Sequence, residues 1–144
     1  MSFFQFDTER CIGCKACVIA CKQLHGGVSY RTVKSLNEER IGVFSGIRIS
    51  SACESCPDAK CVGACENGAY SATIDGIVTL DKSKCKSSGA CIIACPYGAP
   101  VILDGVAAKC DMCDGREGGP FCVAACPQGA LTLSNVRRPF EVLL

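Results

Sequence analysis

The sequence predicts an α+β fold of short helices and small antiparallel hairpins organised around bound metal. Three observations carry this prediction. First, the 144-residue chain has 15 cysteines but no Trp, six Phe and three Tyr, so a core of large side chains would be thin for its length. Second, the cysteines form four groups that each close in C-x3-C. Third, Asp-Gly pairs separate short runs of β-branched residues, which is typical of hairpins.

The four cysteine groups form an internal repeat. In chain order they are Cys11, Cys14, Cys17 and Cys21; Cys53, Cys56, Cys61 and Cys65; Cys85, Cys91 and Cys95; and Cys110, Cys113, Cys122 and Cys126. Groups two, three and four continue as x-x-Gly-Ala, and a glycine at this place stops a helix. Each unit therefore predicts a loop, a short helix, a glycine stop and a strand.

Two hairpins and one further strand are expected between the groups. YSATIDGIVTL (residues 70–80) and VILDGVAAK (residues 101–109) each carry a central Asp-Gly pair, the strongest short-range hairpin signal. Residues 26–50 contain no cysteine and end in IGVFSGIRIS. That ending predicts a strand leading into group two.

The spacing within the groups favours iron–sulfur clusters. Three thiolates at C-x2-C-x2-C lie on one tight loop and can wrap one cluster, with backbone N–H groups directed at the sulfides. The fourth cysteine, expected at a helix start, would face away from that cluster. In bacterial two-cluster ferredoxins the corresponding cysteine ligates the other cluster.

Zinc and disulfides are the alternatives. Structural zinc takes pairs of C-x2–4-C knuckles, which groups two and four could supply, but the third cysteine of group one would have no role. The N-terminus has no secretory signal, so the thiols are expected to stay reduced in the cytoplasm, and an odd cysteine count leaves one unpaired. Iron–sulfur ranks first, zinc second and disulfides third.

Charge and hydropathy exclude two classes of partner. The formal net charge is +1 and no basic stripe is present, so no nucleic-acid partner is expected. No apolar run is long enough to span a bilayer. The chain is therefore expected to be cytoplasmic, or peripheral to a membrane through its partners.

The order of the groups resembles a known family. Groups two and three look like a complete two-cluster ferredoxin nested inside a second one made of groups one and four. This arrangement resembles the four-cluster ferredoxin-like electron-transfer subunits of molybdenum and tungsten oxidoreductases, such as formate dehydrogenase and dimethyl sulfoxide reductase. The resemblance covers residues 7–133 and implies an outer module, residues 1–50 and 100–144, around an inner module, residues 51–99.

The resemblance also implies four ligand sets that exchange their last cysteine. They are Cys11, Cys14, Cys17 with Cys126; Cys110, Cys113, Cys122 with Cys21; Cys53, Cys56, Cys61 with Cys95; and Cys85, Cys91 with Cys65, where Ser88 stands at the place of a ligand. Three 4Fe-4S clusters and an incomplete fourth site are thus expected.

Ser88 leaves three outcomes for the fourth site. A 3Fe-4S cluster needs only three cysteines and ranks first. An empty site, filled by the small side chains of KSSGA and by water, ranks second. Ligation by the serine oxygen ranks third, because its hydroxyl is less acidic than a thiol and a poorer match for a soft site.

The chain departs from the family pattern in other ways. It is short, and Lys22 and Glu66 stand where a proline usually follows the last cysteine. The compact size is most similar to the small subunit that accompanies a tungsten-containing large subunit of the aldehyde oxidoreductase type. That type includes the benzoyl-coenzyme A reductases of anaerobes.

These observations predict an electron-transfer subunit and not an enzyme. It would relay single electrons between a large catalytic subunit and an external redox partner such as a ferredoxin. The sequence holds no phosphate loop and no Ser/His/Asp set that could do bond chemistry. A free polyferredoxin carrier or a redox sensor is the alternative, and a zinc-binding interaction module is the third.

Several other residues have expected roles. His25 is expected to cap a helix C-terminus. Asp111, Asp114 and Glu117 are expected to be exposed loop charges. The tail RRPFEVLL is either a docking arm or packed on its own domain. Five lysines could offset cluster charge, although each one singly is expected to be solvated: Lys15, Lys22, Lys84, Lys86 and Lys109.

Overall fold

The computed structural model describes residues 3–36 and 47–134. The predicted combination of short helices and small antiparallel hairpins is confirmed over these residues. The elements are β1 (Phe3–Phe6), α1 (Ala16–Leu24), β2 (Thr32–Leu36), β3 (Ile47–Ser51), α2 (Lys60–Ala64), β4 (Tyr70–Ala72), β5 (Val78–Leu80), the 3-10 turn η1 (Lys82–Lys84), α3 (Ala90–Ala94), β6 (Val101–Leu103), β7 (Val106–Ala108), α4 (Phe121–Ala125) and β8 (Leu131–Ser134).

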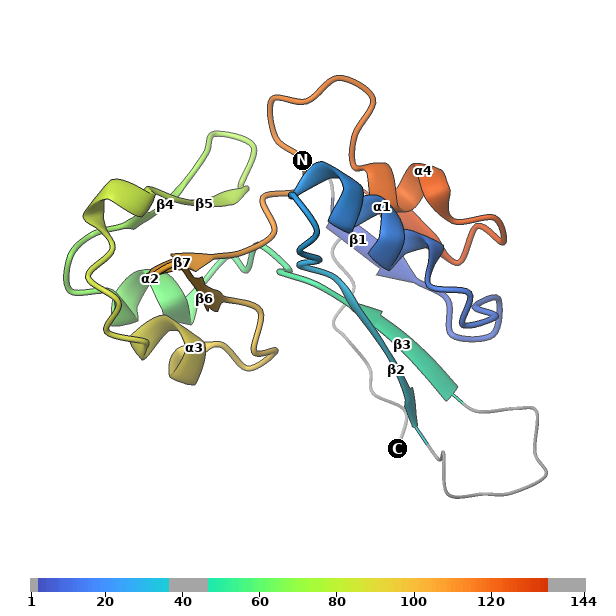
Figure 1. Cartoon of the computed structure of the whole chain (residues 1–144), viewed down its shortest axis with the longest axis horizontal. Helices are drawn as coiled ribbons and strands as arrows, with labels where there is room; N and C mark the ends of the chain where they lie inside the picture. The colour runs from blue at the N-terminus through green and yellow to red at the C-terminus, as the bar shows by residue number, and fades with distance from the viewer. Residues whose placement is uncertain (1–2, 37–46, 135–144) are drawn as a thin grey trace.

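The strands pair into four antiparallel two-stranded sheets within the described residues. β1 pairs with β8, so the first and last described strands of the chain lie side by side. β2 pairs with β3, β4 with β5, and β6 with β7. Helix α1 packs against α4, and α2 against α3. Figure 1 shows α2, α3 and β4 to β7 gathered on one side, and α1, α4 and β1 on the other.

Each of the three shortest helices occupies one C-x3-C segment. Helices α2, α3 and α4 contain the third cysteine expected of their group and end on the last one, at Cys65, Cys95 and Cys126. The expectation that the last cysteine starts a helix was therefore wrong. Pro96 and Pro127 disfavour helical backbone at the residue before them, and Cys95 and Cys126 are extended, with ψ of 119° and 109°.

Both hairpins were predicted correctly. In the β6–β7 connection, Asp104 and Gly105 have φ of 51° and 80°, the paired positive values of a type I′ turn. Strand β3 confirms the strand expected before group two over residues 47–51, and residues 41–46 of that expectation lie outside the described residues. Strands β1 and β2 were not predicted, because neither short run carries a strong local signal.

The described residues bury few large apolar side chains. The main cluster combines Ala69, Val78 and Ala107 with Cys61, Cys91 and Tyr70. Val78 is the largest side chain among those left almost no exposure. Isolated two-stranded sheets are marginal in water, so apolar burial alone is a weak account of this fold.

Candidate metal centres

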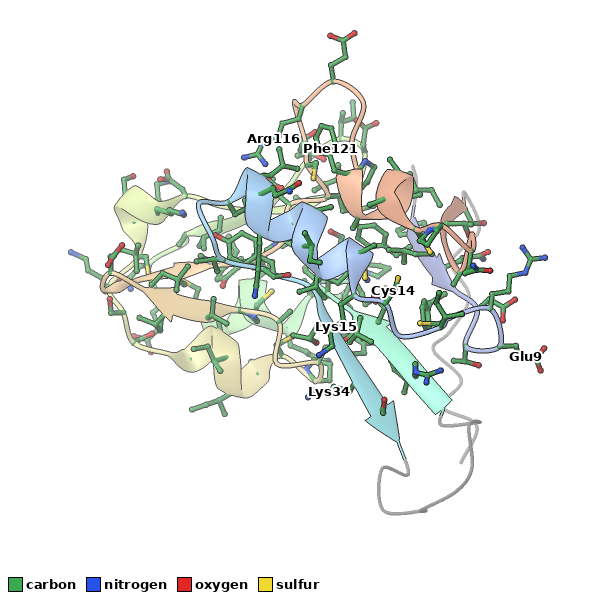
Figure 2. All side chains as sticks on the ribbon, turned by 45° about the vertical axis from the view of Figure 1, so that its right-hand side comes forward. Glu9, Cys14, Lys15, Lys34, Arg116 and Phe121 are labelled. Carbon is green, nitrogen blue, oxygen red and sulfur yellow. The ribbon has the colours of Figure 1, made fainter. Side chains whose placement is uncertain are left out.

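Four hollows in the structure are lined by cysteines, each drawn from two groups. They are named here the Cys11 site (Cys11, Cys14, Cys17 and Cys126), the Cys110 site (Cys21, Cys110, Cys113 and Cys122), the Cys53 site (Cys53, Cys56, Cys61 and Cys95) and the Ser88 site (Cys65, Cys85, Cys91 and Ser88). All fifteen predicted cysteines line one of them. Figure 2 shows Cys14 on the loop that leads into α1 and Phe121 at the start of α4.

The hollows suit a group larger than one ion. Zinc holds its sulfurs about 2.3 Å from a single centre. Within residues 3–36 and 47–134, no three Cys, His, Asp or Glu side chains converge closely enough for one metal ion. The cysteines instead line open hollows of about 350, 320, 710 and 310 Å³, adjoining solvent included, at the Cys11, Cys110, Cys53 and Ser88 sites.

One backbone feature recurs in all four cysteine loops. The residue two positions after the first cysteine has a positive φ in every group, at 73°, 45°, 59° and 58° for Gly13, Ser55, Ser87 and Met112. This conformation costs a non-glycine residue roughly 1–2 kcal/mol. Backbone strain of this kind gathers at functional sites. Its presence in three groups, with a glycine that adopts the same conformation in the first, marks the loops as binding loops.

The strained residues direct their N–H groups at sulfur. Ser55, Ser87 and Met112 donate to the first cysteine sulfur of their own group, at 3.5, 3.4 and 3.3 Å. Further N–H groups reach sulfurs elsewhere: Tyr30 to Cys21 at 3.3 Å, Ala99 to Cys95 at 3.5 Å and Ala107 to Cys85 at 3.3 Å. Such bonds stabilise a thiolate over a thiol.

The pKa values of two cysteines follow these bonds. The N–H groups of Ala107 and Ser87 lower the pKa of Cys85. Burial alone would raise the pKa of Cys126, but four backbone N–H groups of residues 128–131 together lower it. These two thiols therefore lose their protons readily and can bind a metal as thiolates.

Burial dominates at three other cysteines. It raises the pKa of Cys61 and of Cys122 and raises that of Cys110 to about 12. A bound metal deprotonates its thiol ligand outright. We therefore expect these three thiols to stay protonated without metal and to become thiolates only when a metal group binds.

Two buried cations supply the charge that such a group would need. Arg31 is 2% exposed and Lys109 is 8% exposed, and within the described part of the chain neither makes an ion pair with a carboxylate. Lys109 donates to the backbone oxygens of Val78 and Cys110 and lines the Cys53 site. An uncompensated buried charge is costly, and an iron–sulfur cluster with its thiolates is an anion that fits beside both.

The five lysines near the cysteine groups were each expected to be solvated, which is wrong for Lys109 and confirmed for the other four. Lys109 was expected to be solvated and is buried, because the β7 segment carries it under the β5 strand end, where Val78 accepts its hydrogen bond. The remaining lysines are exposed: Lys15, Lys22, Lys84 and Lys86. Figure 2 shows Lys15 directly after Cys14.

The Ser88 site keeps the features of the other three. Ser87 retains the positive φ and the N–H directed at Cys85. Ser88 accepts a hydrogen bond from the N–H of Ala90 at 3.5 Å. Tyr70 also lines this hollow, where its buried hydroxyl interacts with the Cys91 thiol.

His25 caps α1 as predicted. Its N–H donates to the carbonyl of Lys22 at the helix end, and its Nδ1 lies 2.8 Å from the carbonyl of Cys21. Its Nε2 lies 3.1 Å from Arg116, which Figure 2 shows on the loop before α4.

The charges of the group-four loop are only partly as expected. Asp114 and Glu117 are exposed. Asp111 is half-buried, because its carboxylate accepts the N–H of Cys113 at 3.0 Å and so fixes the loop. The tail RRPFEVLL lies outside the described residues.

Sequence reasoning did not single out Arg31, Ser50 and Tyr70, which line the hollows and lie outside the cysteine groups. Arg31 and Ser50 come together through the pairing of β2 with β3, which no local pattern indicates. Tyr70 lies on β4, shortly after Cys65. None of the described helices is long and apolar enough to cross a membrane.

Cysteine-lined hollows, sulfur-directed N–H groups and buried cations define an iron–sulfur protein of the ferredoxin type. Comparison with known families agrees. Residues 45–136 match the 4Fe-4S dicluster domain and residues 3–28 match a 4Fe-4S binding domain. The chain belongs to the 4Fe-4S dicluster domain family.

Known relatives cover most of this chain. The electron transport protein HydN of Escherichia coli (strain K12) is 39% identical over an alignment 152 residues long, which covers 90% of this chain and 85% of HydN. The formate dehydrogenase iron-sulfur subunit of Wolinella succinogenes is 40% identical, over 81% of this chain and 61% of that subunit. AegA of E. coli is 37% identical over 91% of this chain, which spans only 21% of that longer protein.

Proposed function

We propose that the chain is an iron–sulfur electron-transfer subunit that relays single electrons between a catalytic subunit and an external redox partner. The observation that carries this proposal is the set of four cysteine-lined hollows. Bound clusters would supply one-electron redox chemistry. The protein's own residues ligate through sulfur, direct N–H groups at the ligands and exclude water. The relatives named as electron transport or iron-sulfur subunits support the same role.

The four ligand sets belong to this proposal, with one site for each hollow. Three would hold 4Fe-4S clusters through four cysteines each. We also propose that the chain divides into an outer module, residues 1–50 and 100–144, around an inner module, residues 51–99. The pairing of β1 with β8 and of α1 with α4 supports the outer module, and the packing of α2 on α3 supports the inner one.

The Ser88 site would hold a 3Fe-4S cluster through Cys65, Cys85 and Cys91. Its loop keeps the strained positive φ of Ser87. Such strain gathers at functional sites, which supports a bound group at this one. The N–H groups of Ser87 and Ala107 both donate to Cys85 Sγ, at 3.4 and 3.3 Å. These bonds stabilise a thiolate over a thiol, which favours a bound cluster over an empty site.

The catalytic partner would be a molybdenum or tungsten subunit. A subunit of the anaerobic dimethyl sulfoxide reductase of E. coli, 38% identical over 92% of this chain, and the formate dehydrogenase subunit support this class. The narrower choice of a tungsten subunit of the aldehyde oxidoreductase type is part of the same proposal. Anaerobic affinity purification with molybdenum and tungsten analysis tests it, and recovery of the chain alone would favour a free polyferredoxin carrier or a redox sensor.

Iron counting combined with low-temperature EPR tests the cluster content. Anaerobically purified protein is expected to contain about 15 irons and to give a strong signal in the oxidised state, because a three-iron cluster is then paramagnetic. About 12 irons without that signal would indicate an empty Ser88 site, and about 16 would indicate a fourth iron held by another ligand. Near-zero iron with zinc present would contradict the proposal.

Replacement of Tyr70 by Phe is expected to lower the midpoint potential of the Ser88 site without loss of iron. Burial and the neighbouring Cys91 thiol raise the pKa of Tyr70, so its hydroxyl stays protonated and can donate toward sulfur, which raises a cluster's potential. The expected change is on the order of tenfold in the oxidised-to-reduced ratio, or about 59 mV. EPR-monitored redox titration measures it.

Tyr97→Phe is the matched control, because Tyr97 lines the Cys53 site and is 42% exposed. It should leave the three-iron signal and its midpoint unchanged. An equal shift in both variants, or none in Tyr70→Phe, would show that the Tyr70 hydroxyl does not act on this site.

A further inference from the structure

Arg31 lies between the Cys110 site and the Cys11 site. It precedes β2 and lines the Cys110 hollow, together with Phe4 of β1. Its Nη1 donates to Ser50 Oγ at 3.1 Å, and Ser50 Oγ lies 3.6 Å from Cys17 Sγ. Ser50 and Cys17 both line the Cys11 hollow. A continuous polar path thus runs from one hollow through Arg31 and Ser50 to a cysteine of the other.

The guanidinium of Arg31 is buried with donors left over. The residue is 2% exposed, and its Cζ lies 4.4 Å from the centre of the Phe4 ring. Nε and Nη2 are buried and have no hydrogen-bond partner in the described part of the chain. Arginine does not lose its proton in proteins, so this is a permanent charge. A protein keeps such a charge only where something compensates it.

We propose that Arg31 is a shared positioning cation of the two outer sites, which raises the reduction potential at the Cys110 site directly and at the Cys11 site through Ser50 and Cys17. This inference rests on the proposed function, since it requires clusters at both sites. Reduction adds negative charge, and a fixed cation in a low-dielectric interior stabilises the reduced form. The direct effect at the Cys110 site exceeds the relayed effect at the Cys11 site.

Arg31 already acts on the thiols of the Cys110 site. Its guanidinium interacts with the side chain of Cys122 as well as with Ser50. The ammonium of Lys109 is instead occupied by the backbone oxygens of Val78 and Cys110. Arg31 therefore differs from Lys109 in directing its charge at side chains of the two sites.

Arg31→Gln tests the inference in the full chain by EPR-monitored redox titration, with iron counted on the same samples. One reduction step is expected to move to lower potential by at least a tenfold change in the oxidised-to-reduced ratio, or about 59 mV for one electron. The midpoint potential of a second reduction step, that of the Cys11 site, should fall by less. The midpoint potentials of the remaining steps should not change. Arg31→Lys keeps the charge and should restore most of the larger shift.

Lys34→Gln is the matched control for charge. Lys34 follows Arg31 by three positions, lies on β2 and is exposed. Figure 2 labels it on this strand. Removal of this solvent-screened charge should move no step. An equal shift in Lys34→Gln would overturn the inference, because the effect would then not depend on the buried site.

Iron content separates the possible failures. Full iron in Arg31→Gln with unmoved steps would overturn this inference and leave the proposed function intact, whereas an iron-free wild type would remove the proposed function itself. If Arg31→Gln loses iron, Ser50→Ala decides, because it cuts the path to Cys17 and keeps the buried cation. A downward shift of a single step in Ser50→Ala supports the inference, and no shift overturns it.

Discussion

Removal of iron is expected to abolish the cooperative unfolding transition of this protein. The described residues form only two-stranded sheets, which are marginal by themselves, and helices α2, α3 and α4 have five residues each. Without clusters, buried Arg31 and Lys109 would also lack a counter-charge. Metal binding and folding are therefore expected to be one process.

Thermal melts followed by circular dichroism measure this effect. The wild type is compared with protein stripped of iron by a chelator under anaerobic, reducing conditions, so that disulfides cannot form. Iron and sulfide together should restore the transition, while zinc alone should not. A stripped protein that still melts cooperatively at the original temperature would show that the apolar core suffices.

Replacement of Ser88 by cysteine is expected to turn the three-iron site into a four-iron site. The new thiol would stand in the loop at the place of the absent ligand, among Cys65, Cys85 and Cys91. Iron should rise from about 15 to about 16 per chain, and the EPR signal of the oxidised protein should disappear, because an oxidised 4Fe-4S cluster is silent.

Ser71→Cys is the control for adding a thiol. Ser71 is an exposed residue of β4 that lines none of the four hollows, so this variant should keep the three-iron signal. A Ser88→Cys protein with unchanged iron and unchanged signal would mean that position 88 does not face the cluster. Absence of the signal in the wild type as well would instead favour an empty or serine-ligated site.

Local features of the chain were predictable because they depend on neighbouring residues. The C-x3-C segments and the following glycines set the short helices α2, α3 and α4, and Asp104-Gly105 fixed the β6–β7 hairpin through its positive φ values. Cysteine spacing indicated iron–sulfur chemistry, although the exchange of the last cysteine between groups came from a family resemblance and not from the spacing. The helix position of Cys95 and Cys126 was misjudged, since the effect of the following proline was overlooked.

The sequence by itself determined the chemistry of the ligands, the loops that carry them and the local turns. Only the tertiary structure decided which groups meet. Cys126 reaches the Cys11 site because β8 pairs with β1, and Arg31 becomes a buried cation because Phe4 of β1 covers it. These contacts join residues far apart in the chain, and no local pattern encodes them. Turn geometry is a short-range steric property, whereas burial and charge compensation depend on what the whole chain brings to one place.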